Sequence, residues 1–332
     1  MEKPREVWVD AVKIVACVLV AVGHFFQSMV TSRILQEGAF LKAFDQSIYT
    51  FHVPLFFICS GYLYQKNTII DSFSAWGRNL MRKLLTLGVP YLFFSVATWL
   101  LKNVFSGSVN AQTEGIFRTL LLEPFSPYWY LYCLFLFFFL IPAFRNKKQA
   151  LIVAVISFAA QIVSWNNVGY FYALKIVLEY AIWFVLGMLV KTYEITKFFE
   201  KKGTFTAGAA ASFVFLLYVF FREGRWNGLE RFCAGIAACV GVIFVFGYLF
   251  RKNRESGWLQ KISKYTMPVF LMHTLFAAGL RVVLLKLGVR NAVVHICLGL
   301  SISFIGPVVA AEVLNHIKWT AWILHPEKLL KK

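Results

Sequence analysis

Two ionisable residues suited to an active site, Lys13 and His24, lie in the apolar stretch at the N-terminus of this 332-residue chain. In a helix, a separation of eleven residues turns about 1,100°, close to three full turns, so both side chains share one face, roughly 16 Å apart along the axis. A lysine near the cytoplasmic end would hold a phosphate, and histidine is the usual general base near neutral pH. The alternative is a histidine hydrogen-bonded between helices and a lysine that extends to the membrane surface.

Other ionisable residues also interrupt apolar stretches. Such residues are costly in lipid and usually face a bundle interior or a wet cavity, so each is a functional candidate. Apart from the first stretch, they are Asp45, His52, Lys175, Glu179, Glu230, Arg231, His273, Arg281, Lys286, His295 and Glu312. Four of them are explained by extension of the side chain to the membrane surface near the end of a span: Glu230, Arg231, Lys286 and Glu312.

The elements that carry these residues are apolar runs of about 17 to 25 residues, the length that a helix needs to cross roughly 30 Å of hydrocarbon. The chain is 59% apolar and 15% charged, whereas soluble domains are about half apolar and a quarter charged. The runs are continuously apolar rather than alternating, which argues against a membrane barrel. We expect a single domain, 1–332, with spans near 7–30, 44–65, 84–101, 126–144, 149–165, 170–190, 204–221, 229–250, 265–287 and 292–314.

Lysine and arginine concentrate in the N-terminal segment, the C-terminal tail and alternate loops. Because basic loops stay in the cytoplasm, this alternation predicts an all-α integral membrane protein, a bundle of about ten transmembrane helices with both termini cytoplasmic, in the cell membrane. The net charge of +18 then reflects topology and contact with anionic headgroups of the lipid bilayer, and no nucleic acid partner is expected. The six cysteines have neither metal-site nor disulfide spacing, so no metal is expected.

Six short motifs follow one another in an order typical of one family of membrane enzymes. They are 10–13 (DAVK) with His24, 51–62 (FHVPLFFICSGY), 78–83 (RNLMRK) leading to 89–91 (VPY), 128–132 (YWYLY), 183–187 (WFVLG) and 267–273 (MPVFLMH). Together they resemble the acyltransferase 3 family, whose first helix carries an Arg-x10-His signature after an aspartate. Lys13 stands in place of that arginine. It keeps the positive charge but lacks the planar fork that binds phosphate through two hydrogen bonds.

The resemblance implies transfer of an acyl group, commonly acetyl, from acyl-CoA (acetyl-CoA) on the cytosolic side to a hydroxyl of a sugar, glycan or similar acceptor. Acyl-CoA would be a co-substrate, and no permanently bound cofactor is implied. His24 would remove the proton of the acceptor hydroxyl. The residues expected to bind acyl-CoA phosphates are Lys13 and a basic cluster before the third span, Arg78, Arg82 and Lys83.

Supporting or acceptor-side roles are expected for Asp10, His52, Glu179 and His273. His52 enters its span from the outside and would share the level of His24. His273 lies about eight residues into a span that starts inside, so it should lie below His24, where it contacts either the donor or a carbonyl. Glu179 either pairs with Lys175, four residues earlier, or binds acceptor hydroxyls or orients a histidine. Ser60 with Gly61 indicates close helix packing.

An alternative function is a transporter or exporter of a lipid-linked or polymeric saccharide, a role proposed for relatives of this family. Transporters often show inverted repeats and broken helices, and neither is clear here, so the histidine and the basic cluster favour the enzyme. Some relatives carry an extracytoplasmic hydrolase-like domain that helps to complete transfer, and no such domain is expected from this sequence. Either the chain completes transfer alone or a separate extracytoplasmic partner protein does. The sequence identifies neither the acceptor nor the acyl group, acetyl or succinyl.

Overall fold

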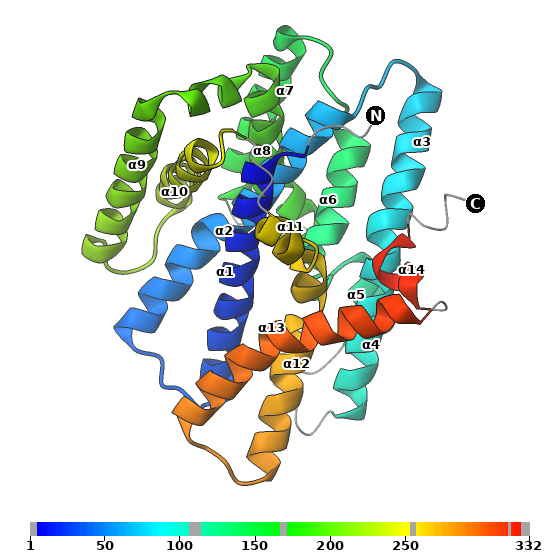
Figure 1. The fold of residues 1–332 in the computed structure, drawn as a ribbon, viewed down its shortest axis with the longest axis vertical. Helices are drawn as coiled ribbons and strands as arrows, with labels where there is room; N and C mark the ends of the chain where they lie inside the picture. Colours follow the sequence, from blue (N-terminus) through cyan, green and yellow to red (C-terminus); the bar gives the residue numbers. More distant parts are fainter. Residues whose placement is uncertain (1–4, 106–113, 167–170, 253–256, 318–319, 327–332) are drawn as a thin grey trace.

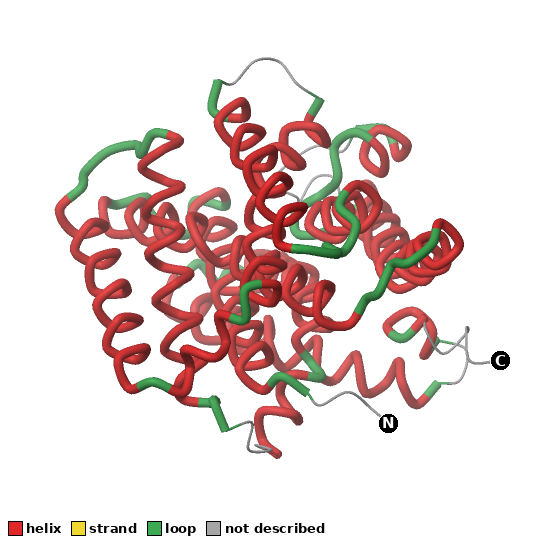
Figure 2. Tube along the Cα trace, turned by 90° about the horizontal axis from the view of Figure 1, so that it is seen from above, coloured by secondary structure: helices red, strands yellow, loops and turns green. Residues whose placement is uncertain are grey.

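The structure is a computed structural model that describes residues 5–105, 114–166, 171–252, 257–317 and 320–326. Within these ranges every regular element is a helix (Figures 1 and 2). In chain order they are α1 (Val7–Thr31), α2 (Ala39–Asn67), α3 (Phe73–Lys83), the π-helical segment η1 (Leu84–Gly88), α4 (Val89–Val104), α5 (Ile116–Leu121), α6 (Trp129–Leu140), α7 (Lys147–Ser164), α8 (Tyr172–Thr192), the 3-10 helix η3 (Ile195–Glu200), α9 (Lys202–Phe221), α10 (Gly228–Leu249), α11 (Gly257–Ser263), α12 (Thr266–Lys286), α13 (Ala292–His316) and α14 (Ala321–Leu324).

Each predicted span coincides with a helix. In the described part of the chain, 8 helical segments are long and apolar enough to cross a membrane. The spans predicted at 44–65 and 126–144 correspond to α2, which is long but more polar, and to α6, whose 12 residues cover only about 18 Å. An integral membrane bundle is therefore confirmed, while the count of ten and the orientation stay predictions. Residues 1–4 and 327–332, the termini predicted to be cytoplasmic, lie outside the described residues.

The third span differs most from its predicted bounds, 84–101. Here α3, η1 and α4 form one run of 32 residues, Phe73–Val104, which is about 48 Å long and exceeds the roughly 30 Å of hydrocarbon. Its first part, α3, has no buried residue and carries the basic cluster, so most of the expected loop before this span is a helix that extends beyond the apolar layer. η1 lies just before Pro90, whose ring lacks the N–H that a regular helix would use there.

Helices α1, α2 and α8 form the centre of the bundle. In Figure 1 the pair α9 and α10 flanks one side of α1 and α2, and α6 and the long α3–α4 run flank the other. Helix α9 is peripheral, and it exposes large apolar side chains such as Phe213, Phe220 and Phe221 that suit contact with lipid. The buried core contains mainly aromatic and aliphatic side chains of α2, α6 and α8, among them Phe57, Phe137 and Phe184.

Two glycines bring the backbones of α2 and α8 into contact. A Cβ added at Gly61 would collide with the carbonyl oxygen of Phe184, and one added at Gly187 would collide with the carbonyl oxygen of Ile58. Small residues that allow such an approach are common where membrane helices pack. The close packing predicted at Ser60 and Gly61 is therefore present, and Ser60 also hydrogen-bonds the Tyr130 hydroxyl at 2.9 Å.

We expect Gly61→Ala and Gly187→Ala each to lower the thermal unfolding temperature of the purified protein, because overpacking typically costs about 1–3 kcal/mol. The matched control is Gly279→Ala in α12, where an added Cβ meets no atom within 4 Å. Alanine there should be neutral or slightly stabilising, since it favours helix more than glycine does. An unchanged unfolding temperature in Gly61→Ala would contradict this account of the α2–α8 contact.

Candidate active site

Helices α1 and α12 run in parallel and bring two predicted site residues together. The Cys17 thiol donates to the carbonyl of Thr266 at 3.4 Å, and seven residues further along each helix the rings of His24 and His273 stack, with centroids 5.5 Å apart. The expectation that His273 lies below His24 is therefore wrong. Helix α11 occupies the space beside the first turns of α1, where Leu259 packs. Helix α12 therefore begins beside Cys17, further along α1 than the sequence analysis assumed.

Tyr49 connects His24 with His52. Its hydroxyl lies 2.9 Å from Nδ1 of His24, and its ring meets the His52 ring edge-on, with centroids 4.7 Å apart. His52 is buried, and its Nδ1 donates to the carbonyl of Ile48 at 2.6 Å. The structure thus places His52 close to His24, but the contact between them runs through a tyrosine that the sequence analysis did not single out.

A chain of hydrogen bonds fixes the proton position on His24. It starts at Asp45, whose ionised carboxylate only accepts, and which receives a hydrogen bond from Nε2 of Gln27 at 2.8 Å. The Gln27 carbonyl oxygen therefore faces Tyr49 and accepts from its hydroxyl at 2.8 Å. With its one proton used there, the Tyr49 oxygen must accept from Nδ1 of His24. His24 is then protonated on Nδ1, and its Nε2 carries the lone pair that a base needs.

Nε2 of His24 faces a hydroxyl group, that of Ser126, at 3.3 Å. Ser126 is exposed and belongs to the non-helical segment before α6, which is why the predicted span 126–144 is so short a helix. Irregular backbone at membrane depth is tolerated where protein surrounds it. Tyr128 anchors this segment, because it is fully buried and its hydroxyl contacts Thr98 at 2.9 Å and donates to the carbonyl of Leu271 at 3.1 Å.

The basic residues expected to bind the donor divide into two groups. Lys83 is half-buried, and its Nζ lies 4.4 Å above the ring of Phe138 on α6. Its charge is repelled first by that of Arg82 and then by that of Lys13. Arg78 and Arg82 are exposed on α3. The structure therefore places Lys83 against α6 and the two arginines on the surface of the extension of the third span.

Asp10 lies at the same end of the bundle, but its partner is not Lys13. It forms an ion pair with Arg5, which also donates to the Ser263 hydroxyl and so ties the start of α1 to α11. Glu6 likewise pairs with Lys66 at the end of α2. Through its ion pair, Asp10 helps to hold the helices together. Its carboxylate therefore does not neutralise the positive charge of Lys13.

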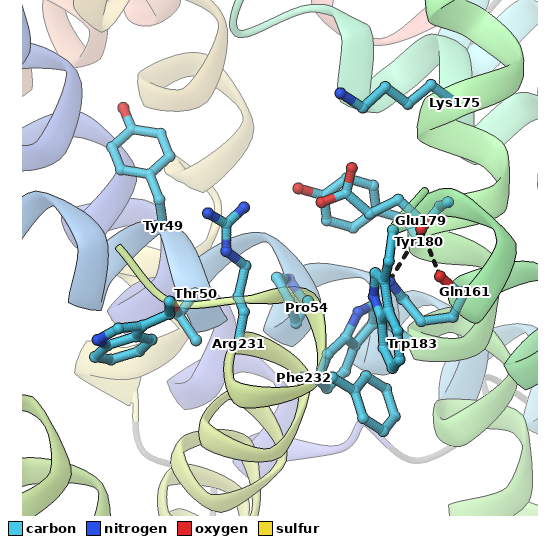
Figure 3. Close-up of a pocket in the computed structure, with 14 residues that line it drawn as sticks. Tyr49, Thr50, Pro54, Gln161, Lys175, Glu179, Tyr180, Trp183, Arg231 and Phe232 are labelled. Atoms are coloured by element: carbon cyan, nitrogen blue, oxygen red, sulfur yellow. Dashed lines mark hydrogen bonds between the residues drawn. The ribbon is translucent and has the colours of Figure 1, made fainter. Parts of the chain in front are cut away.

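Glu179 lines a cavity of about 200 Å³ between α2, α7, α8 and α10. Figure 3 shows that Lys175, Glu179 and Arg231 all direct their charged groups into it. Tyr49 also lines this cavity, so the same side chain borders the cavity and holds His24. The carboxylate of Glu179 interacts electrostatically with both Arg231 and Lys175. Tyr49 thus stands between the cavity that Glu179 lines and the two histidines, His24 and His52.

The sequence analysis missed Gln27, Tyr49 and Ser126 because they are neutral, and the search was for ionisable residues in apolar runs. Helical spacing carried a signal for two of them. Gln27 follows His24 by three residues, and Tyr49 follows Asp45 by four and precedes His52 by three, so each set shares a helix face. Ser126 had no such signal, because an irregular segment places it.

The family model described as an acyltransferase domain matches residues 6–312. Among curated proteins, the nodulation protein NolL of Mesorhizobium japonicum is 28% identical over 137 residues, which cover 41% of this chain and 35% of that protein. The chain thus spans about a third of the length of this curated relative. No solved structure matches the chain.

Proposed function

Because the chain belongs to the acyltransferase 3 family, we propose that it transfers an acyl group, commonly acetyl, from acyl-CoA to a hydroxyl of a saccharide or glycan. The observation that carries this proposal is His24, whose Nδ1 is committed to Tyr49 and whose Nε2 faces an alcohol, the side chain of Ser126. That is the arrangement of a general base with its substrate hydroxyl. The acceptor hydroxyl would take the place that the Ser126 hydroxyl occupies.

The reaction balances without a covalent enzyme intermediate. Nε2 of His24 takes the proton as the acceptor oxygen attacks the thioester carbonyl, the C–O bond forms, and the C–S bond breaks. The leaving thiolate of CoA then takes the proton from Nε2, so that an ester and a free thiol are released. Tyr49 keeps the imidazole in one tautomer, and its oxygen stabilises the positive charge that develops on the ring.

The donor would enter from the end of the bundle that carries Lys13 and Lys83. Their combined charge suits the pyrophosphate of CoA, and the exposed Arg78 and Arg82 suit its other phosphate. The pantetheine arm would then follow α1 over the roughly 16 Å to His24. Its amide N–H groups match Nε2 of His273, which is buried and has no hydrogen-bond partner within the described ranges. This supports contact with the donor, one of the two roles expected for His273. Its Nδ1 donates a hydrogen bond to the carbonyl of Val269 at 2.8 Å.

One prediction separates a catalytic base from a structural histidine. His24→Gln and His24→Ala should both lower the rate of transfer of labelled acetyl from acetyl-CoA by about 10²–10⁴, because neither side chain takes a proton at neutral pH. Tyr49→Phe, which removes the acceptor for Nδ1–H and the donor to Gln27 but keeps the imidazole, should lower the rate less. Near-normal transfer by His24→Gln would remove His24 from the mechanism, and the saccharide exporter would become the better account.

A second prediction concerns the donor. Replacing Arg78 and Arg82 together by glutamine should weaken acetyl-CoA binding by about tenfold or more, since a hydrogen bond to a charged group is worth about 1.5–3 kcal/mol. Both side chains are exposed, so folding should not suffer, and Lys13→Arg should preserve or improve binding. The matched control is Lys197→Gln, an exposed cation paired with Glu194. Binding that is indifferent to Lys13, Arg78 and Arg82 would show that the phosphates bind elsewhere.

The proposed orientation places the α8–α9 connection in the cytoplasm and the α9–α10 connection outside. In a variant whose native cysteines are replaced, a cysteine at Glu223 should react with a membrane-impermeant maleimide in intact cells. A cysteine at Lys197 should react only after permeabilisation. Both residues are exposed, so access differs only by the side of the membrane. Labelling of Lys197→Cys in intact cells would overturn the topology with cytoplasmic termini.

A further inference from the structure

Ser126 and His24 form a pair of the kind that activates a nucleophile. An alcohol within hydrogen-bond reach of a base, with the base oriented by a third group, is the general signature of a serine nucleophile. The Ser126 hydroxyl lies 3.3 Å from Nε2 of His24, and the third group is Tyr49, whose hydroxyl lies 2.9 Å from Nδ1. Because Nε2 carries the lone pair, the Ser126 hydroxyl donates to it, which is the direction that removal of its proton requires.

The contacts of His24 differ from those of the other buried histidines. His52, His273 and His295 each bond a backbone carbonyl, an oxygen that has no proton to give. Such bonds satisfy a polar ring inside a helix bundle and have no further chemical consequence. His24 bonds two side-chain hydroxyl groups instead. One of them, that of Ser126, belongs to an exposed side chain that a substrate can reach.

The segment that carries Ser126 is fixed, although the serine side chain itself is exposed. The next residue, Pro127, is buried, and its ring restricts the backbone. The hydroxyl of Tyr128 donates to the carbonyl of Leu271 at 3.1 Å, which ties the segment to α12, the helix that also stacks a histidine on His24. The alcohol is therefore held beside the base. Since its side chain is exposed, an acyl group on its oxygen would displace no core residue.

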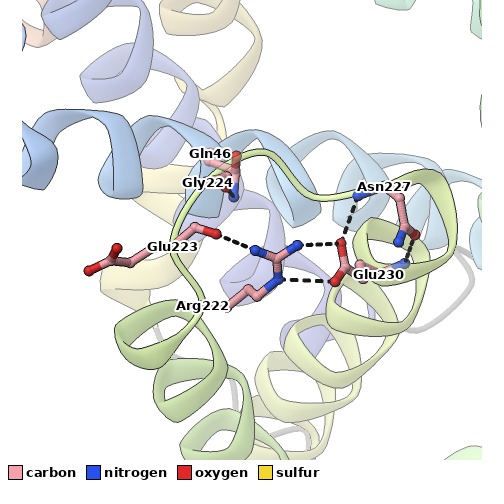
Figure 4. A network of polar contacts seen from close by, with 6 residues as sticks. All are labelled: Gln46, Arg222, Glu223, Gly224, Asn227 and Glu230. Atoms are coloured by element: carbon pink, nitrogen blue, oxygen red, sulfur yellow. Dashed lines mark hydrogen bonds and ion pairs between the residues drawn. The ribbon is translucent and has the colours of Figure 1, made fainter.

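The N-terminal half of α2, which carries Tyr49, is held from the side opposite to Ser126 in the hydrogen-bond chain. Figure 4 shows Gln46 of α2 beside Gly224 in the connection between α9 and α10, and Nε2 of Gln46 donates to the Gly224 carbonyl at 3.3 Å. The ion pair of Arg222 with Glu230, at 3.0 Å, fixes this connection in turn. The group that orients the base and the alcohol that faces it are thus positioned independently, by different connections between helices.

We propose that Ser126 is a site of self-acylation, whose Oγ takes the acyl group from acyl-CoA when no acceptor is bound. The inference rests on the proposed function, which supplies the donor and the base. Nε2 of His24 removes the Ser126 proton as Oγ attacks the thioester carbonyl. The C–O bond forms, the C–S bond breaks, and the CoA thiolate takes the proton from Nε2. The acyl group is then held as a serine ester after CoA leaves.

A bound acceptor prevents this reaction. Its hydroxyl occupies the place of the Ser126 hydroxyl at Nε2, and the direct transfer described above proceeds. The same base therefore serves two alcohols in turn, one from the acceptor and one from the protein, and the occupancy of the acceptor site decides between them.

The test needs no acceptor. The full-length protein, purified in lipid nanodiscs, is incubated with acetyl-CoA that carries a labelled acetyl group, then digested and analysed by mass spectrometry. We expect the label on Ser126, and His24→Gln should slow the labelling about 10²–10⁴-fold. The matched control is Ser301→Ala, which removes an exposed hydroxyl of α13 that donates to the carbonyl of Cys297 at 2.7 Å. The label on Ser126 should be unchanged in that variant.

The chemistry of the label provides a second, independent measurement. Acetyl on a serine oxygen is an ester that alkaline hydroxylamine releases, whereas acetyl on a lysine is an amide and stays. Ser126→Ala should remove the ester. Ser126→Cys keeps a nucleophile beside His24, so it should be labelled as a thioester at the same position, which hydroxylamine releases at neutral pH. Thermal unfolding of both variants shows whether they fold as the unaltered protein does.

The outcomes separate this inference from the proposed function. If labelled acetyl reaches saccharide in membranes but Ser126 stays unlabelled without acceptor, the inference fails and the function stands. A label on Ser126 that does not depend on His24 is ordinary chemical acetylation and would also overturn the inference. A His24-dependent label on Ser126, without transfer to any saccharide, supports self-acylation and removes the saccharide from the proposed function. The absence of both label and transfer would overturn both proposals.

Discussion

The arrangement around His24 depends on one constraint, that a polar group in the apolar layer must find its partner within the protein. His24 meets this constraint through Tyr49, Tyr49 through Gln27, and Gln27 through Asp45 in the N-terminal part of α2. Each member donates towards the carboxylate, and a carboxylate accepts only. The chain therefore has one hydrogen-bond direction, and the tautomer of neutral His24 follows from a residue three contacts away.

The chain in turn depends on how closely the helices approach. Gly23 precedes His24, and a Cβ there would lie 3.3 Å from the Tyr49 ring, tighter than ordinary contact. At the other half of α2, Gly61 lies against the backbone of α8. Small residues at both levels thus fix α2 between α1 and α8. Since Tyr49 is on α2, its position relative to His24 follows from backbone contacts rather than from a flexible side chain.

Much of this architecture was predictable from the sequence, and the limits have physical causes. Runs of apolar residues gave the helices, because crossing lipid demands both length and apolarity. The spacing of Lys13 and His24 gave a shared face, because one helix carries both. The positions of residues on different helices relative to one another were harder to predict from the sequence. The level of His273 depends on where α12 begins along α1, and Ser126 depends on an irregular segment anchored by Tyr128. No pattern within a single helix encodes such offsets.

The two ends of α1 differ in their electrostatic surroundings, and under the proposed function this difference would separate the donor from the acceptor. At the start of α1, which is cytoplasmic in the proposed orientation, Asp10 pairs with Arg5 rather than with Lys13. Near the other end, Asp45 accepts a hydrogen bond from a neutral amide rather than pairing with a cation, and Nε2 of His24 faces the Ser126 hydroxyl. Under the proposed function, the first end would hold the long anionic donor and the second would carry out the proton transfer. The pantetheine arm of the proposed acyl-CoA donor would then cover the roughly 16 Å between them along the helix.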